Sequence, residues 1–359
     1  MLTADFDYEL PEGAIAQSPA EPRDSSRLLV TADMSDHVFS ELPDLLGPDD
    51  IVVVNDTRVR AARLHLTKAE TGGAVEMLLL DRLENGNWEA LVRPARRLRR
   101  GTRLVGEHLE ARLESDPVDG IAEVALEASE DVEAVIDKAG EVPLPPYITA
   151  SLADPSRYQT VYARTPGSAA APTAGLHFTE ELLERLERKT AGIARVELRV
   201  GLGTFRPIQT ERVSDHRMHR EWVSVPAETV DAIARATSRG GRVVAVGTTV
   251  VRALETAARE GDLRPWTGHT DLFITPGFRI RVVDRLVTNF HMPRSSLLVM
   301  IAAFMGPGWR EAYSVALQRG YRFLSFGDAM PCAREQPCPT PPHGASKRPT
   351  APPGPGTWS

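Results

Sequence analysis

The chain is 359 residues long but has only two cysteines, Cys332 and Cys338, both near its C-terminal end. The residues before them have no thiol pair for a disulfide, which predicts a protein of the reducing cytoplasm. The two cysteines and His343 lack the spacing of a zinc site, so no metal is expected. The longest hydrophobic run, Leu297–Met305, is too short to cross a bilayer, and residues 1–10 lack the basic and apolar regions of a secretory signal. These absences predict a cytoplasmic protein without membrane contact.

Common nucleotide-binding loops are also missing. The segment 201–206, GLGTFR, resembles a dinucleotide fingerprint only superficially, because its sixth position is Arg206 and no acidic residue follows at the required place. No phosphate-binding loop of the Walker type is present. The formal net charge of −7 argues against non-specific coating of nucleic acid but allows a local basic patch. A bound cofactor is therefore not expected.

Hydrophobic periodicity divides the chain into segments of different character. Within residues 1–58, the unbroken run Ile51–Val54 is typical of a strand covered on both faces. Residues 59–150 contain short apolar segments separated mainly by Gly and Asn turns, the pattern of a small antiparallel β-barrel. From residue 151 to 330, strand-like and helical patterns alternate again, as at the predicted helix Ala227–Ser238.

We therefore predict an α/β fold: an open mixed-sheet domain formed from both ends of the chain, residues 1–58 and 151–330, interrupted by an inserted small antiparallel β-barrel domain of residues 59–150. The last residues, Pro331–Ser359, hold nine of the 28 prolines and almost no large apolar side chains. They are expected to form a disordered tail. Inserted domains tend to lie over a cleft, which would suit a large substrate.

Three polar turns follow apolar segments between Arg242 and Met305. Gly247-Thr248-Thr249 comes after the predicted strand Val243–Val246, Thr270-Asp271 precedes the apolar run 272–274, and Thr288–Pro293 opens into Ser295-Ser296. A strand that leads through a tight turn into a helix presents free backbone N–H groups and hydroxyls, which suit an anionic or polar ligand. The three turns together predict one cleft at the edge of the sheet.

Each turn also has a purely structural interpretation. Gly-Thr-Thr before a helix can be a simple cap, Asp271 can be a turn residue, and His291 can be a structural histidine with satisfied hydrogen bonds. The function of any one turn stays open on these grounds. The string 289–296, which combines Asn, His, Pro and two Ser residues, is more than a turn requires, and this favours a functional site.

Two further loops carry polar residues into the same predicted domain. Asn55–Arg58 follows the buried strand, and Thr173–Phe178 brings His177 toward a helix expected to begin after its N-cap, Thr179. Either loop could be structural or could contact a ligand. His219 and Glu221 are expected on one face of a strand, where such a pair can bind a ribose or move a proton.

The segment Arg93–Arg100 contains five arginines in eight residues, within the predicted barrel. Such a run is commonly a solvated turn. In an acidic protein, a dense run of arginines without an acidic residue instead favours a patch that contacts phosphates. Both interpretations are testable.

These motifs, with Asp7–Pro11, Arg23–Leu29 and Phe326–Met330, resemble the S-adenosylmethionine:tRNA ribosyltransferase-isomerase family of queuosine biosynthesis. The resemblance extends from about residue 4 to residue 330. It implies that S-adenosylmethionine is a co-substrate whose ribosyl group is transferred to 7-aminomethyl-7-deazaguanine in the tRNA anticodon. The ribosyl group is rearranged to an epoxycyclopentane, which gives epoxyqueuosine-tRNA and releases adenine and methionine. It also implies an α/β domain plus a β-barrel.

The resemblance makes the polar residues of these turns candidates for the site, and the partners it implies are S-adenosylmethionine and the anticodon arm of tRNA. We expect the protein to be a monomer. Candidates for acid–base catalysis are His177, His219, Glu221, Asp271 and His291. Candidates for substrate binding are Asp56, Arg58, Thr173, Thr204, Arg206, Gly247, Thr248, Thr249, Arg252, Phe273, Asn289, Phe290, Ser295 and Ser296, and candidates for tRNA binding are Arg93, Arg96, Arg97, Arg99 and Arg100.

One position departs from the family pattern. The motif leads us to expect histidine before Val-Gly-x-Gly-Thr-Phe, and this chain has Arg199 there. A diverged, non-catalytic protein that binds tRNA or S-adenosylmethionine is therefore the alternative function. A methyltransferase is a third possibility, but the glycine-rich adenosine loop that usually follows the first strand of such enzymes is missing.

Overall fold

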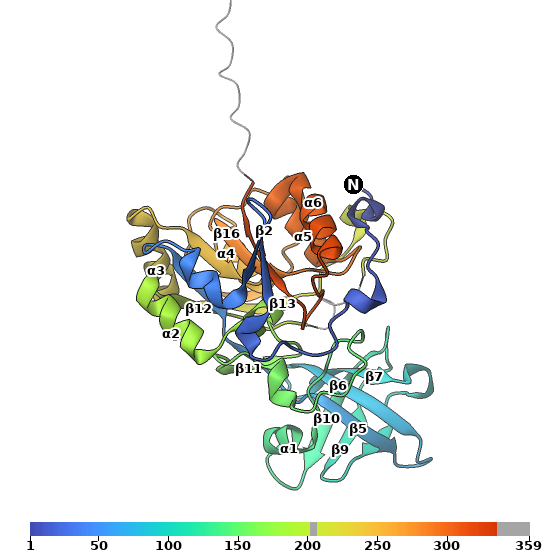
Figure 1. Ribbon diagram of the computed structural model, residues 1–359. Coiled ribbons are helices and arrows are strands. Elements are labelled where there is room, and N and C mark those ends of the chain that lie inside the picture. Colours follow the sequence, from blue (N-terminus) through green and yellow to red (C-terminus); the bar gives the residue numbers. More distant parts are fainter. Residues whose placement is uncertain (202–206, 336–359) are drawn as a thin grey trace, which may run out of the picture.

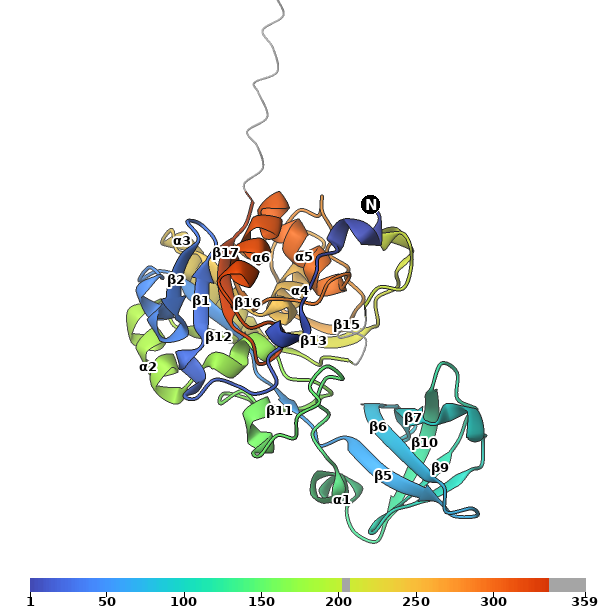
Figure 2. The same cartoon turned by 45° about the vertical axis from the view of Figure 1, so that its right-hand side comes forward.

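The computed structural model describes residues 1–201 and 207–335. They form a large sheet covered by helices and a separate closed barrel of six strands (Figures 1 and 2). The sheet is built from both ends of the chain, because β1 (Arg27–Val30) lies beside β17 (Ala329–Ala333) in it. The predicted α/β fold with an inserted antiparallel barrel is confirmed.

The centre of the nine-stranded sheet consists of four parallel strands, β12, β3, β14 and β16. Their carboxyl ends meet at one edge, which is where ligands bind in open α/β sheets. The remaining strands extend the sheet mainly by antiparallel pairing. In spatial order the strands are β15 (Trp266–Thr270), β13 (Glu221–Val225), β12 (Ile193–Leu198), β3 (Ile51–Asn55), β14 (Val243–Val246), β16 (Arg285–Asn289), β17, β1 and β2 (Ser35–Val38).

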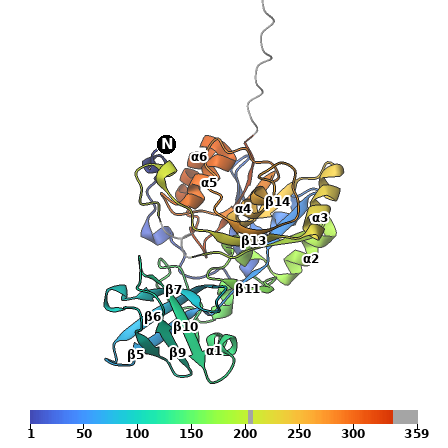
Figure 3. The same cartoon turned by 180° about the vertical axis from the view of Figure 1, so that it is seen from behind.

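Helices cover both faces of the sheet, as Figure 3 shows from behind. Strand β3 explains this layering, since Ile51 and Val53 pack into one apolar cluster while Val52 and Val54 pack into another. The sequence prediction that this strand is buried on both faces is confirmed. The first cluster contains residues of α3 (Ala227–Ser238), α4 (Thr248–Ala257), α5 (Ser296–Met305) and α6 (Trp309–Gln318), and the second contains residues of α2 (Glu180–Lys189) and the 3-10 helix η4 (Phe39–Asp44).

Local sequence signals determine where several helices begin. The Thr179 hydroxyl accepts a hydrogen bond from the N–H of Leu182, at 3.1 Å, and caps α2 as predicted. Ser295 caps α5 in the same way through the N–H of Leu298. Helix α4 differs, because its N-cap is Gly247 and no side chain caps it.

The barrel lies between two short strands that connect it to the sheet. The chain passes from the large sheet to the barrel through β4 (Thr57–Val59) and returns to the sheet through β11 (Thr165–Ser168). These two strands pair in parallel. Short strands with turns between them close the barrel, as the sequence pattern predicted, and α1 (Val132–Ala139) follows its last strand. Around the barrel the order is β10 (Ile121–Ala128), β7 (Trp88–Arg93), β6 (Ala74–Arg82), β5 (Arg63–Lys68), β8 (Arg103–Val105) and β9 (Leu109–Leu113).

The predicted start of the tail at Pro331 is wrong. Strand β17 continues to Ala333 because its backbone pairs with β16, with Leu286 opposite Cys332, and the Cys332 side chain is buried. The apolar run 272–274, which follows the second predicted turn, is a loop and not a strand.

The domain boundaries at residues 58 and 150 stay predictions. Within the described residues, no helix is long and apolar enough to cross a membrane.

Candidate functional site

A chain of hydrogen bonds joins three of the predicted residues at the carboxyl edge of the sheet. The Asn289 amide Nδ2 donates to His177 Nε2 at 3.1 Å, and the Thr173 hydroxyl donates to Asn289 Oδ1 at 2.9 Å. His177 Nδ1 lies 2.8 Å from the hydroxyl of Ser26. Because Nε2 accepts a hydrogen bond, Nδ1 carries the imidazole proton and donates it to Ser26. Sequence analysis missed Ser26, since nothing in its motif signals a partner far along the chain.

The imidazole of His177 is neutral in this setting. Burial, with smaller contributions from the charges of Arg322 and Arg23, lowers its pKa to about 3. Its ring lies 4.8 Å from that of Phe39, centroid to centroid. The geometry therefore suits a residue that orients Asn289, and it does not suit a base that gains charge near neutral pH.

His291 is also buried and neutral. Burial lowers its pKa to about 3, and its Nε2 lies 2.9 Å from the hydroxyl of Thr288. Two tyrosines fix its backbone: Tyr8 donates its hydroxyl to the His291 carbonyl at 2.6 Å, and the His291 N–H donates to the Tyr313 hydroxyl at 2.9 Å. Tyr8 belongs to the motif Asp7–Pro11 near the N-terminus. This motif therefore helps to hold the backbone at the edge of the sheet, although it is far away in the sequence.

A small cavity of about 30 Å³ opens beside these groups. Tyr147, from the segment that leaves the barrel, lies in its wall, and the Tyr147 and Ser325 hydroxyls are 2.7 Å apart. Burial raises the pKa of Tyr147 to about 12, so the phenol stays protonated. The other lining residues are Thr173, Asn289, His291, Met292, Ser295, Leu297 and Leu324.

A second, larger cavity of about 750 Å³ lies between the sheet and the barrel and is called the interdomain cleft below. The barrel contributes Asp81 and Glu89. Asp81 is exposed to solvent, but partial desolvation by the cleft walls raises the pKa of its carboxyl, and desolvation together with the charge of Asp81 raises the pKa of the half-buried Glu89. Carboxyls with raised pKa values in a cleft are candidates for proton transfer. The sheet contributes Arg199, His219, Glu221, Trp222 and His269 to the opposite wall.

Arg199 is held firmly in the interdomain cleft. Its Nε donates to Glu197 at 2.7 Å, and its guanidinium lies over the ring of Trp222, 5.6 Å from the centroid. The ring of His269 packs edge-on against the same indole at 5.2 Å. Gly167 leaves the space that the arginine occupies, because a Cβ there would lie 3.1 Å from the Arg199 side chain. The local packing is therefore built around an arginine at this position.

The predicted pairing of His219 with Glu221 on one strand is wrong. Strand β13 begins only at Glu221, so His219 lies before it in an exposed loop. The buried Glu221 carboxylate instead forms an ion pair with Arg252 and accepts the N–H of Gly201 at 2.8 Å. Arg252 also donates from Nε to the Leu272 carbonyl at 3.2 Å. Both His219 and Glu221 nevertheless line the interdomain cleft.

The structure does not bring the second polar turn to the others. The Asp271 carboxylate is 66% exposed and lies 3.9 Å from Arg259, so it faces solvent. Phe290 is fully buried and stacks on Phe323 at 4.8 Å, which makes it a core residue. The prediction that all three turns share one cleft is therefore wrong, because the second turn follows β15 at the outer edge of the sheet.

The remaining predicted residues are scattered. Asp56 is partly buried, and burial raises its pKa, whereas Arg58 is exposed. Phe273 packs edge-on against His216 at 5.5 Å. Thr204 and Arg206 lie outside the described residues. Ser296 begins α5 and is buried.

The arginine run forms the rim of the barrel. Arg93 ends β7, and a 3-10 helix, Ala95–Arg97, follows it beside a hollow of about 720 Å³. Arg93, Arg96 and Arg97 line this hollow. Ion pairs of the barrel involve other arginines, such as Arg103 with Glu110, and none found in residues 1–201 and 207–335 includes a member of the run. The run therefore forms no ion pair within the described residues, although the Arg99 guanidinium donates to the Leu98 carbonyl at 2.7 Å.

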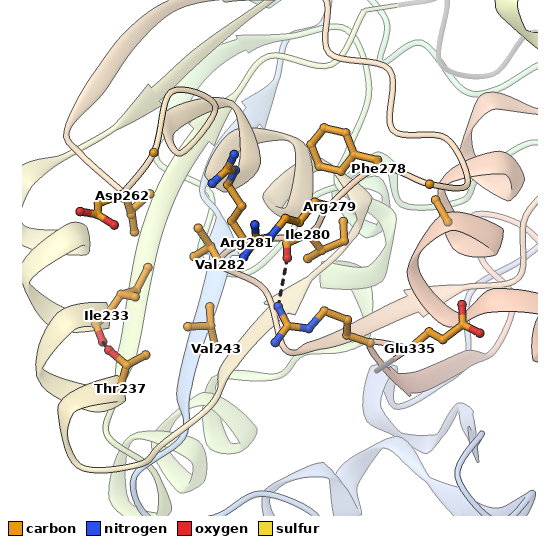
Figure 4. Close-up of a pocket in the computed structure, with 15 residues that line it drawn as sticks. Ile233, Thr237, Val243, Asp262, Phe278, Arg279, Ile280, Arg281, Val282 and Glu335 are labelled. Carbon is orange, nitrogen blue, oxygen red and sulfur yellow. Dashed lines mark hydrogen bonds between the residues drawn. The ribbon is translucent and has the colours of Figure 1, made fainter. Parts of the chain in front are cut away.

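A further cavity of about 1000 Å³ is lined by other residues, among them Ile233, Phe278 and Arg281 (Figure 4). It is lined by Val243, the first residue of β14, and so lies toward the opposite edge of the sheet. Arg334 crosses it to donate to the Ile280 carbonyl at 3.1 Å. None of the predicted site residues lines it. In the part of the chain that is described, no group of three or more His, Cys, Asp or Glu side chains could hold a metal ion.

Comparison with known proteins gives the class to which this fold and site belong. Residues 3–331 match the model of the queuosine biosynthesis protein family, and the chain belongs to that family. It is 51% identical over 341 residues to a protein of Moorella thermoacetica named S-adenosylmethionine:tRNA ribosyltransferase-isomerase, across 92% of this chain and 99% of the relative. A relative of the same name from Rubrobacter xylanophilus is 52% identical over 339 residues, across 92% and 97% of the two chains. The crystal structure of S-adenosylmethionine tRNA ribosyltransferase from Thermotoga maritima aligns with a TM-score of 0.53 and 40% identity, over 91% of this chain and 99% of that one.

Proposed function

We propose that this protein is an S-adenosylmethionine:tRNA ribosyltransferase-isomerase. It transfers the ribosyl group of S-adenosylmethionine to 7-aminomethyl-7-deazaguanine in tRNA and isomerises it, which gives epoxyqueuosine-tRNA and releases adenine and methionine. The single observation that carries this proposal is about 50% identity to enzymes of that name over nearly their whole length. The cytoplasm, where tRNA is found, is its proposed location, and a monomer without metal or further cofactor its proposed form.

The chemistry requires proton transfer and several oriented contacts. The sulfonium acidifies the adjacent ribosyl carbon, so that a base can remove a proton there and adenine can leave. The amine of the RNA base then attacks, and loss of methionine closes the epoxide. These steps need a base, an acid for adenine, and groups that hold the ribosyl unit in place.

Of the two cavities near the carboxyl edge, the interdomain cleft of about 750 Å³ has room for a substrate, whereas the small cavity of about 30 Å³ has room for about one water molecule. One segment of the chain connects them, since Gly167 and Ala169 line the interdomain cleft and Thr173 lines the small cavity. We assign His177 as a positioning residue that holds Asn289. We assign proton transfer to Asp81 and Glu89, because both carboxyls line the interdomain cleft and the pKa of each is raised above its ordinary value.

The arginine run is proposed to hold the tRNA. It lies on the inserted barrel, whose carboxylates Asp81 and Glu89 face the sheet. Phosphate contacts at the rim would bring the anticodon arm to the interdomain cleft while the acidic remainder of the protein repels other RNA surfaces.

Product analysis tests this function. Purified protein is incubated with S-adenosylmethionine and tRNA that carries the aminomethyl precursor, and small products are separated by chromatography. Equal amounts of free adenine and methionine are expected. Adenosylhomocysteine would indicate methyl transfer instead, and binding of both substrates without any product would indicate the non-catalytic alternative.

A further inference from the structure

Helix α4 begins in the protein interior without a capping side chain. Its N-cap, Gly247, follows strand β14 and has a φ of 91°, a conformation that disfavours the residues able to cap with a side chain. Thr248 and Thr249, the first two helical residues, are only 6% and 8% exposed. The first N–H groups of a helix have no partner within it, so a buried helix start needs an acceptor from elsewhere.

The structure contains unpaired donors at this point. The hydroxyl of Thr249 is buried and has no hydrogen-bond partner among the described residues. It is aimed at the helix start, since it lies 3.5 Å from the position a Cβ would take on Gly247. The N–H groups of Thr248 and Thr249 have no acceptor in the described residues either. Buried donors without an acceptor are costly, so a ligand atom that accepts these hydrogen bonds would be stabilised here.

This helix start belongs to the same edge as the candidate site. Ala174, next to the Thr173 that holds Asn289, lies 3.8 Å from the Cβ position on Gly247. The Gly247 N–H donates to the Val287 carbonyl on β16, at 2.8 Å, so the turn is fixed to the strand that carries Asn289. A group bound at α4 would therefore lie beside the small cavity.

The required acceptor is small and negatively charged. The N-terminus of a helix carries a partial positive charge, which favours anions and disfavours cations. A phosphate of the tRNA backbone is joined to sugars on both sides and cannot reach so enclosed a position. S-adenosylmethionine has one anionic group, the carboxylate of its methionyl arm, while its ammonium and sulfonium are cations.

We propose that the start of α4 binds the methionyl carboxylate of S-adenosylmethionine through the N–H groups of Thr248 and Thr249 and the Thr249 hydroxyl. This assignment rests on the proposed function and specifies which part of the co-substrate each group holds. The turn Gly247-Thr248-Thr249 would then bind an anion, and it would not act as a simple cap of the helix.

Binding of a matched ligand pair tests the assignment. Affinities for S-adenosylmethionine and for its decarboxylated analogue are measured by calorimetry without tRNA. The wild-type protein should bind the analogue at least about tenfold more weakly. Thr249→Val should weaken S-adenosylmethionine about tenfold and leave the analogue unchanged. Since the buried hydroxyl is unpaired, this variant should fold with undiminished thermal stability.

A threonine in another helix provides the control. The Thr237 hydroxyl in α3 bonds to the Ile233 carbonyl of its own helix, so Thr237→Val should bind both ligands as the wild type does. A converse variant, Thr249→Asp, places a carboxylate at the helix start. It should melt at a higher temperature and lose S-adenosylmethionine affinity at least about tenfold while retaining the analogue.

The outcomes separate this inference from the proposed function. Equal wild-type affinity for the two ligands, or an equal loss of both in Thr249→Val, would overturn the carboxylate subsite while adenine release still supported the enzyme. Failure to bind S-adenosylmethionine at all, together with no adenine release, would overturn the proposed function and the subsite with it.

Discussion

The amide of Asn289 and the imidazole of His177 are hydrogen-bonded at 3.1 Å although 112 positions separate them in the chain. Their contact joins the end of a central parallel strand to the 3-10 helix η7 (Thr173–His177) before α2, and it fixes the tautomer of a neutral histidine. The edge of the sheet beside Asn289 is thus organised by buried neutral groups, while the carboxyls with raised pKa values, Asp81 and Glu89, lie on the barrel wall of the interdomain cleft.

The two buried histidines should make the protein sensitive to mild acid. His177 and His291 have a pKa of about 3 when folded, against about 6.5 when unfolded. Below pH 6.5 the unfolded chain takes up protons that the folded chain does not, so stability falls as the pH is lowered toward 3. Each histidine contributes a slope of about 1.4 kcal/mol per pH unit. Urea unfolding between pH 7 and 4.5 should show this loss, and His177→Gln should reduce the slope. An unchanged slope would mean that the imidazole is charged in the folded state.

The end of the folded chain can be located by truncation. Removal of residues 336–359 should leave the melting temperature unchanged, because this proline-rich segment has almost no large apolar side chains to pack against the domain. Removal of all residues after Met330 deletes the end of β17 with the buried Cys332 and should lower the melting temperature by roughly 5 °C or more. Equal melting temperatures for the two truncated proteins would contradict the role assigned to β17.

Asp81→Asn should reduce turnover about a hundredfold if the barrel carboxylates transfer protons. Because the Asp81 charge raises the pKa of Glu89, the variant should also shift the acidic limb of the kcat/KM profile to lower pH. Glu70→Gln, on an exposed turn of the barrel, is the matched control and should behave as the wild type. Normal turnover with an unshifted profile in Asp81→Asn would remove these carboxylates from the mechanism.

The arginine run should control the salt dependence of tRNA binding. Arg96→Gln combined with Arg97→Gln should weaken tRNA binding and reduce the slope of log affinity against log salt by roughly 0.7 to 0.9 for each arginine that pairs with a phosphate. Affinity for S-adenosylmethionine should not change. The double variant Arg103→Gln and Arg112→Gln removes arginines that already pair with Glu110 and Glu114, and it should retain the wild-type slope. The same slope in both double variants would place the tRNA elsewhere.

Arg199→His should lower activity. The guanidinium pairs with Glu197, lies over Trp222 and fills the space beside Gly167, and an imidazole cannot reproduce these three interactions together. The effect should appear as a higher KM or a lower kcat, with little change in melting temperature, since the side chain is partly exposed. Higher activity in the histidine variant would indicate that Arg199 is an impairment relative to the family motif.

Local patterns predicted most of the fold. Helix α3 has the predicted bounds, and the run Ile51–Val54 is the strand buried on both faces. The polar turns after β14 and β16 were also found from sequence, because adjacent parallel strands place their carboxyl ends together. These features depend on neighbours in the sequence or on one simple rule of sheet geometry.

What sequence could not predict depends on long-range packing. Ser26 meets His177 across 151 positions, and Asp81 becomes unusual only because the barrel faces the sheet. Asp271 looked equivalent to the other turn residues but follows an outer strand and turns to solvent. Pro331 resembled the proline-rich tail, yet its strand finds a partner in β16.

The fate of the ribose carbons tests the central claim most directly. The protein is incubated with precursor tRNA and S-adenosylmethionine labelled with carbon-13 in its ribose or, in a parallel reaction, in its methyl group. The tRNA is then digested and its nucleosides are analysed by mass spectrometry. We expect the ribose label in the modified nucleoside and the methyl label in free methionine. Methyl label in the tRNA, or ribose label that stays with adenine, would contradict the account.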